Sequence, residues 1–93
     1  MSVAREAFKQ RTKKFALRVI RLVDSLPNRR SARVMGDQLL RSGTSVGANY
    51  RAACRARSRK EFCSKLGIVE EEADESAYWM ELLIESNTVR QVL

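Results

Sequence analysis

Five cations lie close together in the middle of the chain and could bind a polyanion. They are Arg51, Arg55, Arg57, Arg59 and Lys60. Phosphate binding needs several cations within reach of successive backbone charges, and arginine adds bidentate geometry. Ser58 and the free amides of a following helix could donate further hydrogen bonds, because a helix N-terminus carries unpaired N–H groups. The alternative is a solvated turn, or ion pairs with acidic residues of a neighbouring subunit.

A second set of cations recurs at helical spacing nearer the N-terminus, away from the apolar side of the same segment. It comprises Arg11, Lys14, Arg18 and Arg21. Solvated helix faces often have this composition, but an oligomer would repeat the set and multiply weak contacts with nucleic acid. No nucleic-acid fingerprint is recognisable, and Tyr50 fits an apolar helix face, so base-specific recognition is not expected.

Acidic residues follow in a short run that could suggest metal or acid–base chemistry. The run comprises Glu70, Glu71, Glu72, Asp74 and Glu75. Carboxylate-bridged metal bundles also need histidines, and the chain has none. We therefore expect an exposed face that pairs with arginines, with Glu72 partly buried.

The chain lacks the residue patterns of the common enzyme classes. It has no Walker loop, no dinucleotide-binding glycine pattern and no thiol–histidine pair. Its two cysteines, Cys54 and Cys63, cannot complete a zinc site alone and are expected to be ordinary reduced thiols. The sequence predicts a protein that is not an enzyme, with no catalytic residue, no metal and no cofactor.

Charge is distributed unevenly along the 93 residues. Residues 1–65 contain 17 Lys and Arg against 4 Asp and Glu, whereas residues 66–93 contain 1 against 7. This asymmetry favours a polyanion partner for the basic part, pairing of the acidic part inside an assembly, or both. No stretch is apolar enough to cross a membrane or to act as a signal peptide, so no membrane partner and a cytoplasmic location are expected.

Apolar periodicity predicts three helices, over residues 4–26, 31–53 and 58–86. Pro27 ends the first, Ser31 is a candidate N-cap for the second, and Ser58 with Glu61 forms a capping-box pattern for the third. Residues 88–93 suffice for about one turn. The architecture expected for this single domain, residues 1–93, is an all-α antiparallel bundle.

Two sets of residues are expected to mediate helix packing or oligomer contacts. Gly36, Gly43 and Gly47 form a stripe that lets another backbone come close, although a helix break at Gly43 or Gly47 is the alternative. Trp79, Met80 and Leu83 are expected in the core or at a subunit boundary. Such a short chain buries little surface alone, so self-association is expected.

Several segments resemble the bacterial four-helix-bundle proteins called 23S ribosomal-RNA intervening-sequence proteins. The resemblance covers most of residues 8–86, and its strongest parts are RSGTSVGANYRA at 41–52, Arg55, Arg57 and Ser58, Glu61 and Phe62, LGIVEEEADE at 66–75, Trp79, and ELLIE at 81–85. Many members carry an acidic residue and a glycine where this chain has Arg51 and Ala53. This segment is therefore more basic than the common pattern.

The resemblance implies an antiparallel up-down four-helix bundle whose fourth helix is truncated or missing in this chain, and a homo-oligomer that is commonly a pentamer. A relative, the accessory protein of diversity-generating retroelements, binds nucleic acid and a reverse transcriptase. The expected function is sequence-independent binding of RNA or DNA, with a nucleic-acid-processing enzyme as a further partner. The alternative is a structural or protein-interaction homo-oligomer without a nucleic-acid ligand.

Overall fold

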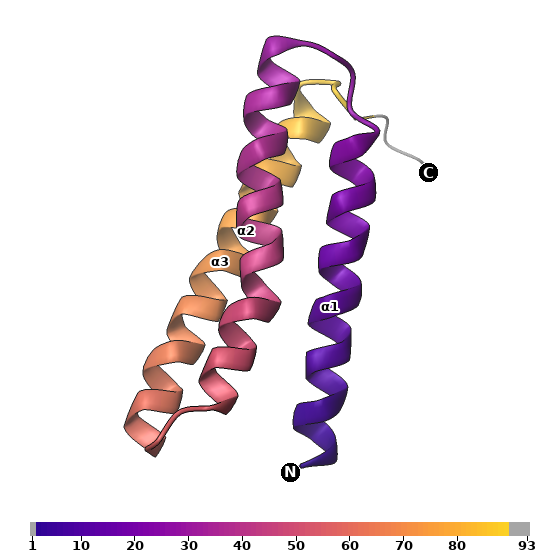
Figure 1. Ribbon diagram of the computed structural model, residues 1–93. Helices are drawn as coiled ribbons and strands as arrows, with labels where there is room; N and C mark the ends of the chain where they lie inside the picture. The colour runs from indigo at the N-terminus through magenta and orange to yellow at the C-terminus, as the bar shows by residue number, and fades with distance from the viewer. Residues whose placement is uncertain (1, 90–93) are drawn as a thin grey trace.

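Three α-helices make up the computed structural model, which describes residues 2–89 (Figure 1). They are α1, Val3–Asp24; α2, Arg30–Cys54; and α3, Arg59–Glu85. The prediction of an all-α chain is confirmed, and residues 2–89 contain no strand. None of the helices in this part of the chain is long and apolar enough to cross a membrane.

Local side-chain contacts fix most of the helix ends. The Ser2 hydroxyl accepts a hydrogen bond from the Arg5 amide, and the Ser58 hydroxyl accepts one from the Glu61 amide at 3.1 Å. The prediction that Ser31 caps α2 is wrong, because Arg29 holds the extended N-cap conformation and Ser31 already lies within the helix. No side chain caps this end, so α2 depends on its tertiary packing.

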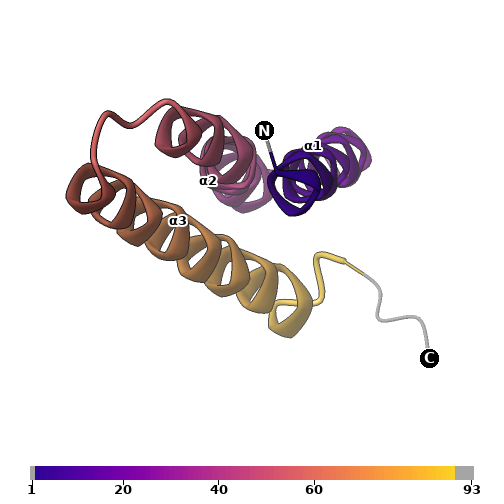
Figure 2. The ribbon, with the colours of Figure 1, turned by 90° about the horizontal axis from the view of Figure 1, so that it is seen from below.

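The central helix is α2, which packs against both α1 and α3 (Figures 1 and 2). No Cα atom of α1 lies within 8 Å of a Cα atom of α3. One core cluster joins Val19, Leu39 and Leu83, and a second joins Val46, Tyr50 and Val69. The buried core therefore runs along α2.

Glycines of α2 face α1 directly. A Cβ atom built at Gly43 would lie 2.9 Å from both methyl carbons of Val19, and one at Gly47 would lie 3.1 Å from the Thr12 hydroxyl. A Cβ at Gly36 would lie 3.0 Å from a methyl carbon of Leu26. The helix continues through these glycines without a break, so they serve the close approach of α1 and not a turn.

Small and polar residues join α2 to α3. The hydroxyls of Ser42 and Ser76, both fully buried, lie 3.0 Å apart. Nearer the surface, Arg41 of α2 pairs with Glu72 at 3.0 Å and with Glu75. These contacts fix the α2–α3 register at its middle.

The chain reverses after α3 through a helix C-cap. Asn87 adopts a left-handed conformation with φ of 58°, and the amides of Thr88 and Val89 donate to the Leu83 carbonyl. Asparagine tolerates this conformation at a helix end. Val89 then packs against the core cluster of Val19, Leu39 and Leu83.

The expected four-helix bundle is wrong for this chain. Residues 2–89 form a three-helix fold, and the segment that follows α3 caps that helix instead of beginning another. Three amphipathic stripes and their caps are all that the sequence supplies in this range. Residues 90–93, at which the start of a fourth helix was expected, lie outside the described residues.

Candidate nucleic-acid interface

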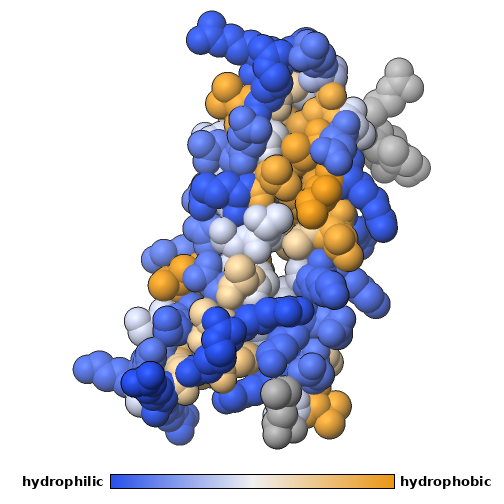
Figure 3. All heavy atoms as spheres, in the orientation of Figure 1, coloured by the Kyte–Doolittle hydropathy of each residue, from blue (hydrophilic) through white to orange (hydrophobic). Residues whose placement is uncertain are grey.

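Cations from all three helices and a turn gather where the N-terminal end of α1 meets the α2–α3 connection. We call these residues the basic end: Arg5, Lys9, Lys13, Arg51, Arg55, Arg57 and Arg59. Hydrophilic side chains project from this end of the molecule, at the bottom of Figure 3. Because α1 and α2 run in opposite directions, the first turns of α1 lie beside the last turns of α2.

The first part of the basic end is a cleft of about 530 Å³ between α1 and α2. From α1, Arg5, Lys9 and Lys13 line it at intervals of four residues, which places them on one face about 6 Å apart along the axis. Arg51 of α2 and Arg55, the C-cap residue of that helix, line the opposite side. Five cations therefore surround one open cleft.

A neighbouring pocket of about 540 Å³ lies at the start of α3. Its lining includes Arg57, Arg59 and Arg5, whose guanidinium carbon lies 4.7 Å from the ring centroid of Phe62. Arg5 lines both hollows and makes them one continuous basic surface. Both free thiols, Cys54 and Cys63, also line this pocket.

A carboxylate of the protein itself, that of Glu61, already binds at the N-terminus of α3. The Glu61 carboxylate accepts a hydrogen bond from the Arg57 amide at 2.9 Å, and the Ser58 hydroxyl oxygen accepts one from the Glu61 amide. The expected contribution of free amides at this helix end is therefore reduced. Binding of a phosphate here would depend on the guanidinium groups of Arg57 and Arg59.

The arginines of the basic end carry uncompensated charge. Two carboxylates lie nearby: Glu6 pairs with Lys9 at 3.7 Å, and Glu61 is engaged by the Arg57 backbone. Within residues 2–89, no ion pair involves Arg51, Arg55, Arg57 or Arg59. Their guanidinium groups remain available to an external anion.

The structure separates the remaining predicted cations from this surface. Lys60 is exposed next to Arg59 but does not line either hollow. Arg11, Lys14 and Arg18 line a different groove, and Arg21 is exposed on α1 outside that lining. Sequence reasoning missed Arg5, Lys9 and Lys13 as partners of Arg51. Their spacing of four residues was visible, but their proximity to α2 depends on how the helices pack.

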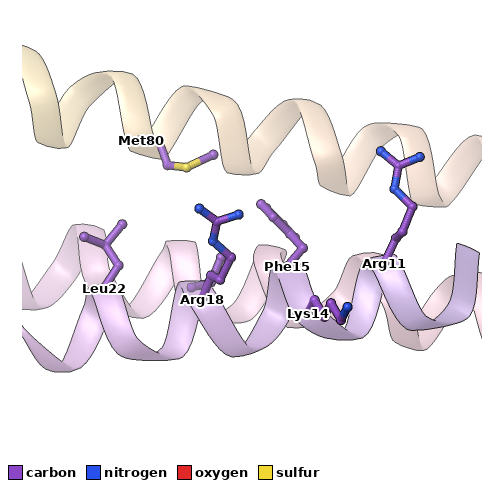
Figure 4. A pocket seen from close by; sticks show the side chains of 7 residues that line it. Arg11, Lys14, Phe15, Arg18, Leu22 and Met80 are labelled. Carbon is purple, nitrogen blue, oxygen red and sulfur yellow. The ribbon is translucent and has the colours of Figure 1, made fainter. Parts of the chain in front are cut away.

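The groove that Arg11, Lys14 and Arg18 line lies between α1 and α3 and has a volume of about 620 Å³ (Figure 4). We call it the α1–α3 groove. Its apolar lining comprises Phe15, Val19, Leu22 and Met80. Met80 points from α3 toward α1, and the guanidinium groups of Arg11 and Arg18 reach toward α3 on either side of Phe15. The predicted packing residues Trp79 and Met80 are partly buried against the core cluster that contains Leu83.

The acidic run of α3 is divided between paired and unpaired residues. Glu72 and Glu75 bind Arg41, and Glu75 also accepts a hydrogen bond from Trp79 Nε1 at 3.1 Å. These two hydrogen bonds, that of Trp79 first, lower the pKa of Glu75. The hydrogen bonds of Arg41 to Glu75, which has the larger effect, and to Glu72 raise the pKa of Arg41. This polar network stabilises the α2–α3 contact.

The aromatic rings near the basic end contact other side chains of the protein, and no metal-binding cluster is found in residues 2–89. Tyr50 is buried, which raises the pKa of its hydroxyl, and the neighbouring Cys54 adds to that shift. Phe8 meets Tyr50 edge-on, with ring centroids 4.6 Å apart. In the part of the chain that the structure describes, no three His, Cys, Asp or Glu side chains are placed to hold a metal ion.

Comparisons with known proteins place the chain in a family. The family model described as 23S rRNA-intervening sequence protein matches residues 6–92. A solved structure from Bacteroides thetaiotaomicron, described as a protein of unknown function from the S23 ribosomal protein family, is 44% identical and superposes with a TM-score of 0.83. The match covers 89% of this chain and 77% of that one. No curated protein matches. The chain therefore belongs to the 23S rRNA-intervening sequence protein family.

Proposed function

We propose that the protein binds the phosphate backbone of RNA, independently of base sequence, through the basic end. The observation that carries this proposal is the convergence of Arg5, Lys9 and Lys13 with Arg51 and Arg55 around one cleft. Glu6 also lines the cleft and pairs with Lys9, and the other cations repel one another unless an external anion neutralises them. A polyanion with several charges in a row is the ligand that fits this arrangement best.

The geometry suits backbone contacts more than base recognition. Three cations of α1 follow one another at steps of about 6 Å, so one strand could meet them in succession. The nearby aromatic rings are engaged within the protein: Arg5 covers the Phe62 ring, and Phe8 contacts Tyr50. Phe8 keeps 37% of its surface exposed, so stacking of a base on its ring would add to contacts that are chiefly electrostatic.

RNA is the first polyanion to test because the family description refers to 23S rRNA. If all five cations of the cleft contact phosphates, the logarithm of affinity should fall with that of salt concentration, with a slope of roughly −3.5 for a single strand and −4.5 for a DNA duplex. A nucleic-acid-processing enzyme is a second partner to test.

Two triple charge reversals test the proposal. One changes the cleft, Lys13→Glu, Arg51→Glu and Arg55→Glu; the other changes the α1–α3 groove, Arg11→Glu, Lys14→Glu and Arg18→Glu. All six positions are exposed, and each triple lowers the formal net charge by the same amount. Arg5 stays unchanged because it packs on Phe62. Circular dichroism verifies that both triples keep their helices.

The readout is the fluorescence anisotropy of a labelled RNA of unstructured sequence, titrated at several salt concentrations with protein kept dilute. The cleft triple should lose most of its affinity, with a shallower salt dependence, and the groove triple should retain most of it. Equal losses would attribute binding to net charge alone. Absence of RNA binding by the wild type would favour the alternative, a protein-interaction module.

A further inference from the structure

We propose that the cleft between α1 and α2 also binds a short polyphosphate chain, that of a nucleoside triphosphate or of inorganic tripolyphosphate, and that this ligand competes with RNA. The inference rests on the proposed function in one respect, since both ligands would use the same cations. It adds a small-molecule ligand that controls the access of RNA to the basic end.

The charge of the cleft matches that of a triphosphate. Five cations and one carboxylate, that of Glu6, line the cleft, so its formal charge is +4. A nucleoside triphosphate carries a charge of about −4, one on each inner phosphate and up to two on the terminal one. One such ligand would therefore neutralise the cations that the protein itself leaves uncompensated.

Cations face the cleft from two sides. Lys13 lines it on α1, and Arg51 and Arg55 line the opposite side. All three are exposed, and within residues 2–89 none of their side chains makes an ion pair or a hydrogen bond. Successive phosphates of a polyphosphate share a bridging oxygen, whereas a sugar separates those of RNA. The charge of a polyphosphate is therefore compact enough for cations of both sides to reach it at once.

The size of the cleft suits a small ligand. Its volume of about 530 Å³ lies within the range of small-molecule sites, roughly 300–1,000 Å³. The α1 wall extends about 12 Å along the helix axis from Arg5 to Lys13. A triphosphate is shorter than this wall and can lie wholly inside the cleft, whereas an RNA strand continues beyond it. Gln10 also lines the cleft, and its side-chain amide can donate to a phosphate oxygen.

The two hollows of the basic end separate the two ligands. Arg57 and Arg59 line the pocket at the start of α3 but not the cleft, so RNA can use them and a short polyphosphate cannot. Two matched variants follow: the cleft double, Lys13→Gln and Arg51→Gln, and the control double, Arg57→Gln and Arg59→Gln. All four positions are exposed, and each double lowers the formal net charge equally. Circular dichroism verifies that both doubles keep their helices.

Titration calorimetry without RNA tests the site directly. At constant ionic strength and without divalent cations, the 93-residue chain should bind tripolyphosphate roughly tenfold or more tightly than orthophosphate or adenosine monophosphate. The cleft double should lose roughly tenfold in this affinity, and the control double should keep most of it. Adenosine triphosphate distinguishes the source: affinity equal to that of tripolyphosphate assigns the site to nucleotides as well, and much weaker binding assigns it to inorganic polyphosphate. Equal affinity for all four compounds, or equal losses in the two doubles, would overturn the proposal.

Competition tests the link to RNA. At constant ionic strength, tripolyphosphate should release labelled RNA from the wild type at a concentration roughly tenfold or more below that needed for orthophosphate. RNA that stays bound when calorimetry shows the cleft to be saturated would overturn the competition. Binding of RNA without binding of tripolyphosphate would overturn this inference alone. Binding of tripolyphosphate without binding of RNA would contradict the proposed function and leave the small-molecule site supported.

Discussion

Gly43 and Gly67 both lie within helices, but an added methyl group would meet different surroundings at the two positions. At Gly43 it would lie 2.9 Å from two carbons of Val19, a stiff β-branched side chain in the core. At Gly67 no heavy atom lies within 4 Å. The two positions therefore separate the packing role of a helix glycine from its cost to the helix.

Gly43→Ala should lower the free energy of unfolding, because a steric cost of about 1–3 kcal/mol exceeds a helix-propensity gain of about 1 kcal/mol. Gly67→Ala, the matched control, should raise it by up to about 1 kcal/mol. Urea denaturation followed by circular dichroism measures both. Equal stabilisation at the two positions would contradict the close approach of α1 to α2.

Glu75 should make stability depend on pH in the acidic range. Its pKa is lowered in the folded state by Trp79 and Arg41, so its contribution is present above the ordinary value of 4.5 and is lost as pH falls through the folded pKa. Glu75→Gln removes the charge but keeps the shape. The variant should be less stable than the wild type at pH 7, and the difference should shrink below pH 4.5. A difference independent of pH would show that packing, not charge, is responsible.

At the scale of the elements, the Ser42–Ser76 contact joins α2 and α3 within the buried core. Ser76 also bonds to the Glu72 carbonyl at 2.9 Å, whereas Ser42 otherwise has only a long contact of 3.4 Å to the Leu39 carbonyl. The serine that remains after one hydroxyl is removed therefore keeps a good hydrogen bond if it is Ser76 and only a poor one if it is Ser42. Ser42 depends on Ser76 more than Ser76 depends on Ser42.

Ser76→Ala should cost about 1–3 kcal/mol, because it leaves the buried Ser42 hydroxyl poorly bonded, and Ser42→Ala should cost less. The double variant should be little worse than Ser76→Ala alone, which a double-mutant cycle measures by chemical denaturation. Ser64→Ala, at an exposed serine of α3, is the near-neutral control. Strictly additive effects would mean that the two hydroxyls do not interact.

For the whole molecule, the position of the basic end makes a prediction about RNA length. The cleft cations lie at one end of the molecule, so an RNA that spans a single cleft should bind one chain with nearly the same affinity per site as a long RNA does. Anisotropy titrations with RNAs of two lengths and dilute protein measure both affinities. Much tighter binding of the long RNA would mean that contacts outside the cleft contribute.

Local sequence signals accounted for the elements and for part of the candidate site. Apolar spacing placed three helices within two residues of their observed ends, and Ser58 with Glu61 marked a helix start that the structure contains. Arg51, Arg55, Arg57 and Arg59 stood out through proximity in the chain alone. These signals are readable because helix periodicity and capping depend on residues three or four positions apart.

Only the tertiary structure decided which faces meet. It joined Arg5, Lys9 and Lys13 to Arg51, assigned Glu72 and Glu75 to Arg41, and kept α1 and α3 apart. A helix pattern shows that a face is apolar but not which surface covers it. That choice depends on the close approach at Gly43 and Gly47, which draws α1 onto α2 and leaves α3 a separate side of the same helix.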